Sequence, residues 1–125
     1  MKKILILEDE PILLDLLNKK LTQQGYTVTI AHNGEEGLFM MAQEIPDLVL
    51  TDIIMPRKDG FAVIAAMKES ELLKNVPIII ISNSGQPVDL NQARALGVFD
   101  WLIKTEFDPQ EVVEKVKQVL AKASQ

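Results

Sequence analysis

Four short apolar runs in this 125-residue chain each end in a polar side chain suited to handling phosphate or a divalent cation. The side chains that follow these runs are Glu8 with Asp9, Asp52, Ser82 and Lys104. If the runs are parallel strands of one sheet, these polar groups meet at its carboxyl edge. Open α/β sheets bind ligands at that edge. The spacing therefore predicts one site built from four strand ends.

The chemistry that such a set allows is phosphoryl transfer assisted by a metal ion. Three carboxylates in one cleft repel each other unless a cation balances them. An all-oxygen set suits Mg²⁺, with Mn²⁺ as an alternative, and Mg²⁺ takes only one or two protein carboxylates. A carboxylate beside the ion can act as a nucleophile and form an acyl phosphate. A lysine and a hydroxyl then neutralise charge on the transferring group, and Lys104 and Ser82 have those side chains.

Composition narrows the class of protein. At 125 residues, with 47% hydrophobic and 25% charged residues, the chain is expected to be one soluble domain spanning residues 1–125. The net charge of −5 and the lack of a basic run argue against direct nucleic-acid binding. No apolar stretch approaches the roughly 18 residues of a membrane span, so no membrane insertion is expected. There is no cysteine, and hence no disulfide, which is compatible with the cytoplasmic location we expect.

Apolar runs alternate with segments of helical period five times along the chain. Strands are predicted at Lys3–Leu7, Thr27–Ala31, Asp47–Thr51, Pro77–Ile81 and Phe99–Ile103. Helices are predicted at Pro11–Gln24, at 33–42, at Phe61–Leu73, at Gln86–Leu96 and from Asp108 to Leu120. Gly25 is the expected stop of the first helix, and Asn33 the expected N-cap of the second.

This order predicts an α/β fold of the (βα)5 kind, with a doubly wound, parallel, five-stranded sheet. In the flavodoxin-like strand order 2-1-3-4-5, the switch point lies between the first and third strands. Those are the strands that lead into Asp9 and Asp52.

The same residues carry a resemblance to a known family. Over its whole length the chain resembles the receiver domain of two-component response regulators, the CheY-like superfamily. The matching residues are Glu8-Asp9, Asp52-Ile53-Ile54-Met55-Pro56 with Asp59-Gly60, Ser82 and Lys104.

The resemblance implies roles for the metal ligands and the nucleophile. Asp9 is expected to bind Mg²⁺ directly, and Glu8 through water. Asp52 is expected to accept the phosphoryl group and to contact the metal. Ile54 is expected to give its backbone carbonyl to the metal.

The resemblance to the receiver family also implies a conformational switch on phosphorylation. Ser82 would hold a phosphoryl oxygen and move on phosphorylation, and Lys104 would pair with the phosphoryl group. Trp101 occupies the position of an aromatic side chain that changes between exposed and buried. Two residues depart from the family pattern: Asn83 replaces a small residue, and Thr105 replaces the proline after the lysine. We expect these two residues to alter the lifetime of the phosphoryl group or the choice of donor.

The function implied is a phosphorylation-activated signalling switch in a two-component system or phosphorelay. The donor would be a sensor histidine kinase or a histidine phosphotransfer protein. An unknown output protein would bind the face formed by the fourth helix, fifth strand and fifth helix. The domain would not be a turnover enzyme, although it would catalyse its own phosphorylation and dephosphorylation.

Three other interpretations remain open from the sequence. A pseudo-receiver would be an interaction module that is never phosphorylated. A phosphohydrolase resembling the haloacid dehalogenase type would need a second aspartate at the position of Ile54. The chain could also be the receiver of a longer, DNA-binding regulator, although we expect a stand-alone domain. It is expected to be a monomer or a weak dimer, with Ile12, Leu16, Phe39 and Met40 as candidates for exposed apolar residues.

Overall fold

Five parallel strands form one sheet in the order β2-β1-β3-β4-β5, as the sequence predicts. The computed structural model describes residues 2–8, 10–52, 60–82, 95, 100–103 and 108–123. The strands are β1 (Lys3–Leu7), β2 (Thr27–Ala31), β3 (Leu48–Asp52), β4 (Ile78–Ser82) and β5 (Asp100–Ile103). β1, β3 and β4 are continuous apolar runs because both faces of a central parallel strand are covered by helices.

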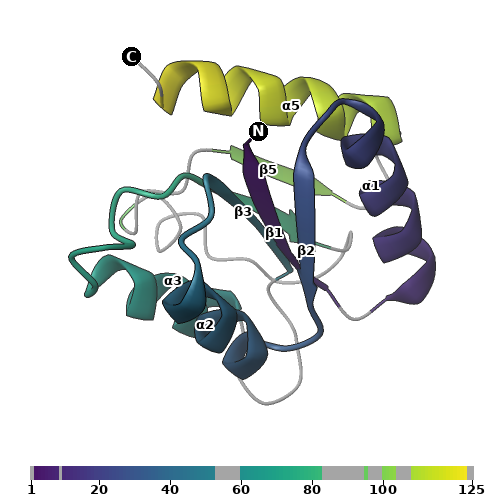
Figure 1. Ribbon diagram of the computed structural model, residues 1–125. Helices are drawn as coiled ribbons and strands as arrows, with labels where there is room; N and C mark the ends of the chain where they lie inside the picture. The colour runs from purple at the N-terminus through teal and green to yellow at the C-terminus, as the bar shows by residue number, and fades with distance from the viewer. Residues whose placement is uncertain are drawn as a thin grey trace.

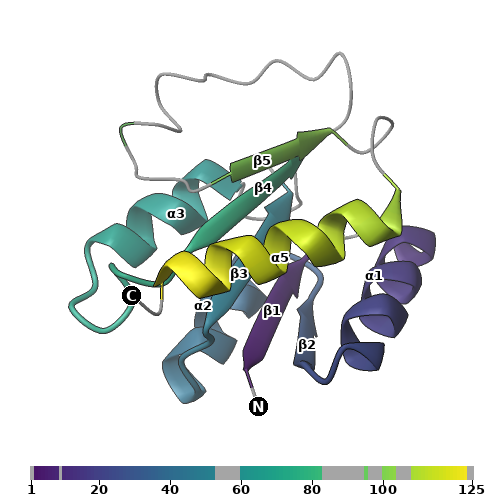
Figure 2. The same cartoon turned by 90° about the horizontal axis from the view of Figure 1, so that it is seen from above.

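Helices cover both faces of this sheet (Figures 1 and 2). The helices are α1 (Pro11–Gln23), α2 (Gly34–Gln43), α3 (Gly60–Lys68) and α5 (Pro109–Ala123). α1 and α5 lie on one face, where their apolar side chains form a core cluster with Ile4, Ile6 and Leu50 of the strands. α2 and α3 lie on the other face, over a second cluster that contains Leu5 and Val49. The sheet therefore separates two cores.

Local signals in the sequence define the ends of α1 and α2. Pro11 opens α1, where its fixed φ suits the first turn. Gly25 follows the end of α1 with a φ of +90°, a conformation that favours glycine. The Asn33 side chain caps α2 by accepting a hydrogen bond from the Glu36 backbone N–H at 2.9 Å. These expectations from the sequence are confirmed.

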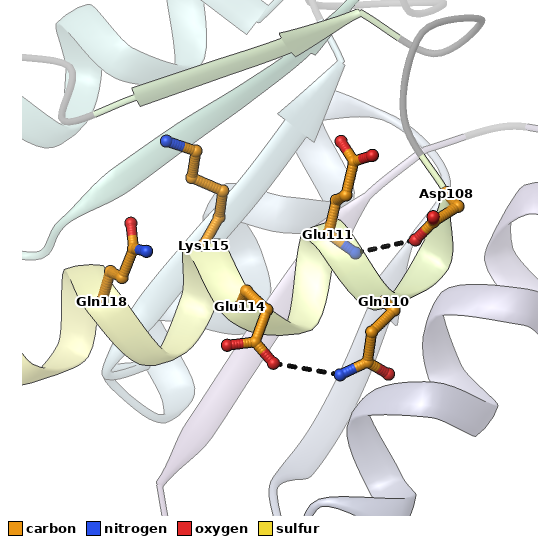
Figure 3. A pocket seen from close by; sticks show the side chains of 6 residues that line it. All are labelled: Asp108, Gln110, Glu111, Glu114, Lys115 and Gln118. Carbon is orange, nitrogen blue, oxygen red and sulfur yellow. Dashed lines mark hydrogen bonds between the residues drawn. The ribbon is translucent and has the colours of Figure 1, made fainter.

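α5 is also capped by an acidic side chain (Figure 3). Asp108 Oδ1 accepts a hydrogen bond of 3.0 Å from the Glu111 backbone N–H, and Gln110 Nε2 donates to Glu114 Oε1 at 3.0 Å. α5 has an apolar stripe that is buried in full, comprising Val112, Val113, Val116, Val119 and Leu120. On the outer side of the helix is a shallow hollow of about 270 Å³, and the described residues that line it are all polar.

Some predicted boundaries and exposures are wrong. β3 and β4 each lie one residue later than predicted, so that Asp52 and Ser82 are the last residues of their strands. α3 ends at Lys68, because the chain leaves the helix in a turn in which Ser70 O accepts from Leu73 N at 3.2 Å. The apolar pattern of the second helix predicts one face made of Leu38, Met41 and Ala42, yet Ala42 is exposed. The predicted helix Gln86–Leu96 lies outside the described residues, apart from the helical residue Ala95.

The expected exposed apolar residues are mostly found at the surface. Ile12 is 85% exposed and Phe39 is 66% exposed, whereas Leu16 is 39% exposed and Met40 is half-buried. In the described parts of the chain, no helix combines the length and the apolar character needed to cross a bilayer.

Candidate functional site

Two buried carboxylates lie at the carboxyl edge of the sheet, on neighbouring strands. Asp52 is the last residue of β3 and is 3% exposed, and Glu8 directly follows β1 and is 1% exposed. β1 and β3 are paired with Leu7 opposite Thr51, and the next position along each strand carries a carboxylate. The predicted meeting of Glu8 and Asp52 at this edge is therefore supported by the strand register.

The alternation of side chains places both carboxylates on the same face of the sheet. Ile4 and Ile6 of β1, and Leu48 and Leu50 of β3, point into the core under α1 and α5. Glu8 and Asp52 continue these even-numbered series, because alternate residues of a strand share a face. The Glu8 backbone N–H still bonds to Ala31 O at 3.1 Å, so β-type pairing extends to this residue. Adjacent strands are about 4.8 Å apart, which brings the two side chains into one small region.

The backbone just before α1 contacts the Glu8 carboxylate. The Glu8 Oε1 atom accepts a hydrogen bond of 3.2 Å from the Glu10 backbone N–H, just before Pro11 opens the helix. Such a local contact orients the Glu8 carboxylate relative to the strand end.

The donor chemistry fits a hard divalent cation. Buried carboxylates in proteins are paired with charge or coordinate metals, and oxygen ligands suit Mg²⁺. Among the described residues, no three His, Cys, Asp or Glu side chains gather into a metal-binding group. The third predicted carboxylate, Asp9, lies outside those residues.

The other predicted site residues are only partly described. Asp52 pairs with Ile81, so Ser82 lies one position beyond it on the neighbouring strand, and Ser82 in turn pairs with Ile103 of β5. For Ser82 and Trp101, the structure describes the backbone within β4 and β5. The remaining predicted residues lie outside the described part of the chain, namely Asp9, Ile54, Asn83, Lys104 and Thr105.

One polar residue beside the site was missed in the sequence. In the sequence Thr51 only ends the apolar run that begins at Leu48, yet its buried hydroxyl donates a hydrogen bond of 2.9 Å to the Asp52 backbone carbonyl. A polar residue at the end of an apolar run, next to a candidate nucleophile, is the signal that would have found it.

Comparison with known proteins agrees with the fold. Residues 4–117 match the family described as response regulator receiver domain. The chain belongs to this family and is homologous to two-component response regulators. Receiver domains of this family bind Mg²⁺ in the active site and are generally not turnover enzymes, and homologous response regulators interact with histidine kinases.

The curated relatives that the chain matches are longer proteins. The chain is 34% identical over 122 residues to the probable transcriptional regulator ycf27 of Porphyra purpurea, covering 98% of this chain and 49% of that protein. It is also 34% identical over 122 residues to the alkaline phosphatase synthesis transcriptional regulatory protein PhoP of Bacillus subtilis, covering 98% of this chain and 50% of that protein. The chain therefore spans about half the length of these relatives.

Solved structures share the fold. A putative response regulator from Chloroflexus aurantiacus has a TM-score of 0.86 and 31% identity, over 96% of this chain and 98% of that one. The receiver domain of the sensor histidine kinase PA1611 from Pseudomonas aeruginosa has a TM-score of 0.85 at 24% identity, over 96% of this chain and 98% of that one. That PA1611 structure is described with a magnesium ion coordinated in its active-site cleft.

Proposed function

We propose that this chain is a phosphorylation-controlled switch in which Asp52 accepts a phosphoryl group. The observation that carries the proposal is the pair of buried carboxylates, Asp52 at the end of the central strand β3 and Glu8 beside it on the same face. A carboxylate held at a strand end in a receiver fold is in the position where this family of sheets presents ligand-binding groups.

The proposed reaction is phosphoryl transfer to a carboxylate. A carboxylate oxygen of Asp52 attacks phosphorus, and the P–N bond of the donor phosphohistidine breaks. The leaving imidazole keeps the electron pair of that bond and takes up a proton, while Asp52 becomes an acyl phosphate. Later attack by water releases inorganic phosphate and restores the carboxylate. After phosphorylation and hydrolysis together, the domain has returned to its starting state, as expected for a switch with autophosphorylation and autodephosphorylation activity.

Mg²⁺ is the proposed cofactor, with Glu8, Asp9, Asp52 and the backbone carbonyl of Ile54 as the residues that would hold it. When bound, the ion supplies positive charge opposite the phosphoryl oxygens. The Glu8 carboxylate accepts a hydrogen bond from the Glu10 backbone N–H, which would help to hold it in that role.

The remaining roles rest on family resemblance and on the positions of β4 and β5. Ser82 is proposed to contact a phosphoryl oxygen and Lys104 to neutralise its charge. Trp101 is proposed to report or relay the conformational change, while Asn83 and Thr105 modulate the lifetime of the acyl phosphate. Phosphorylation would shift an existing equilibrium between two conformers.

The proposed partners are a histidine kinase or histidine phosphotransfer protein and an output protein, in the cytoplasm. The output surface would include the outer side of α5, where the polar side chains in Figure 3 face away from the core. Since the matched relatives are about twice as long as this chain and are named as transcriptional regulators, the output could equally be a DNA-binding domain of the same protein.

The test is intact mass spectrometry after incubation with Mg²⁺ and acetyl phosphate. Wild type should gain one phosphoryl group, and Asp52→Asn should gain none. Asp15→Asn is the matched control, because it makes the same change of charge at an exposed position of α1 and should behave as wild type. Thermal unfolding in the absence of metal should show that Asp52→Asn remains folded, and slightly more stable, because one of the crowded carboxylates loses its charge.

Addition of mass to Asp52→Asn would disprove the assignment of the nucleophile. If wild type gains no mass, binding of beryllofluoride separates the two remaining interpretations. Binding would indicate a receiver that needs its kinase, and absence of binding would favour the pseudo-receiver and refute the proposal.

A further inference from the structure

A hydroxyl group is buried in an apolar layer next to the proposed nucleophile. Thr51 is 0% exposed, and the pairing of β3 places it between Leu7 of β1 and Ile80 of β4, which are also 0% exposed. Leu7 and Ile80 belong to the core cluster under α2 and α3. Since alternate residues of a strand share a face, Thr51 points to this side, and Asp52 points to the opposite side. A hydroxyl in such surroundings is costly unless it makes a hydrogen bond.

The partner of this hydroxyl is the backbone of Asp52. Thr51 Oγ1 donates to the Asp52 carbonyl oxygen at 2.9 Å, and the bond is buried. That carbonyl belongs to the peptide group through which the chain leaves β3. Its direction is set by the ψ torsion of Asp52, so the hydrogen bond restrains this torsion at the last residue of the strand. The restraint comes from the face of the sheet opposite the Asp52 carboxylate.

We infer that Thr51 is a positioning residue for phosphoryl acceptance by Asp52, an inference that rests on the proposed function. Its hydroxyl holds the Asp52 carbonyl and so restrains the ψ torsion of Asp52. The carboxylate therefore keeps one orientation relative to the peptide group through which the chain leaves the strand. Thr51 does not itself contact the phosphoryl group, because its side chain lies under α2 and α3. Its contribution is preorganisation, which lowers the barrier by reducing the reorientation needed at the reacting carboxylate.

Two substitutions separate positioning from packing. Thr51→Val keeps the shape of the side chain and replaces the hydroxyl by a methyl group. Thr51→Ser keeps the hydroxyl and removes a methyl group from the core. If Thr51 acts by positioning, the variant without the hydroxyl is phosphorylated more slowly, and the variant that keeps it is not. The free energy of unfolding should instead be lowered by loss of the methyl group, because a buried cavity is destabilising.

The experiment measures two quantities for wild type, Thr51→Val, Thr51→Ser and Asp52→Asn. The first is the rate of mass gain with acetyl phosphate and saturating Mg²⁺, at a temperature where each variant is folded. The second is the free energy of unfolding in urea. Thr51→Val should be phosphorylated about three- to tenfold more slowly than wild type, the effect of losing one ordinary hydrogen bond in the transition state. Thr51→Ser should retain the wild-type rate while being less stable than Thr51→Val.

Three outcomes would overturn the inference. A wild-type rate in Thr51→Val would show that the hydroxyl does not position Asp52. An equal loss of rate in Thr51→Ser and Thr51→Val would show that the effect is one of packing. Absence of any mass gain on wild type, combined with absence of beryllofluoride binding, would refute the proposed function and this inference together, whereas the first two outcomes refute the inference alone.

Discussion

Substitution of Gly37 by alanine should destabilise the fold, although alanine is the better helix former. Gly37 is a buried residue of α2 that packs against Leu7, the last residue of β1. A Cβ atom at position 37 would lie 2.4 Å from Leu7 Cδ2 and 3.0 Å from Leu7 Cγ. Leu7 is 0% exposed, so its side chain cannot swing into solvent to relieve the contact.

Two effects of opposite sign determine the magnitude. Alanine is favoured over glycine inside a helix by about 1 kcal/mol. Forcing an extra carbon into a well-packed core costs typically about 1–3 kcal/mol. The 2.4 Å approach to a fully buried side chain favours the upper part of that range. We therefore expect Gly37→Ala to lower the free energy of unfolding by about 1–2 kcal/mol.

Urea unfolding of a double-mutant cycle with Leu7→Ala tests this reasoning. Alanine lacks the Cγ and Cδ atoms that meet the new Cβ, so the clash disappears in that background. There, Gly37→Ala should stabilise the protein by about 1 kcal/mol through helix propensity alone. The coupling between the two substitutions should accordingly be about 2–3 kcal/mol.

A control substitution in the same helix measures the effect of helix propensity alone, without a packing contact. Ala42→Gly changes an exposed position of α2 and should cost up to about 1 kcal/mol. The explanation would be refuted if Gly37→Ala had the same effect in both backgrounds, or if it stabilised the protein in which Leu7 is retained.

Two further predictions concern the N-terminus of α2 and the N-terminal edge of the sheet. Asn33→Ala removes the side chain that caps the Glu36 N–H and should lower the free energy of unfolding by about 1 kcal/mol. Asn33→Ser keeps a capping oxygen and should retain most of the stability of wild type. Equal losses of stability for the two variants in urea unfolding would contradict the capping role. The Glu44 carboxylate, through a hydrogen bond and then its charge, raises the pKa of the Lys3 ammonium. A raised pKa in the folded state gives stabilisation that is fully present below the unfolded-state pKa and lost as pH rises through the folded one. Stability measured from about pH 9 to 12 should therefore fall more steeply for wild type than for Glu44→Gln, and parallel profiles would exclude this linkage.

The elements of the fold could be predicted largely because their local signals are strong. Continuous apolar runs identified β1, β3 and β4, and Gly25 and Asn33 defined helix ends through backbone conformation and capping. These signals act within a few residues and do not depend on the rest of the chain.

The length of α3 could not be predicted in the same way. The apolar pattern suggested a helix to Leu73, but α3 ends at Lys68. Leu73 is nevertheless buried, since the turn after the helix brings it onto the core, while Leu72 beside it is 73% exposed. An apolar residue signals burial, and burial can be reached from a turn as well as from a helix.

The sequence by itself determined which kinds of side chain stand at the strand ends, and hence the chemistry the chain can offer. Tertiary structure alone decided that Glu8 and Asp52 share one face while Thr51 supports Asp52 from the other, and that Gly37 must lack a side chain opposite Leu7. The physical reason is that a strand buried on both faces has no alternation of polar and apolar residues, so its sequence does not show which helices each side chain faces. That is decided by the strand register, the pleat and the approach of the helices, once all the strands are assembled.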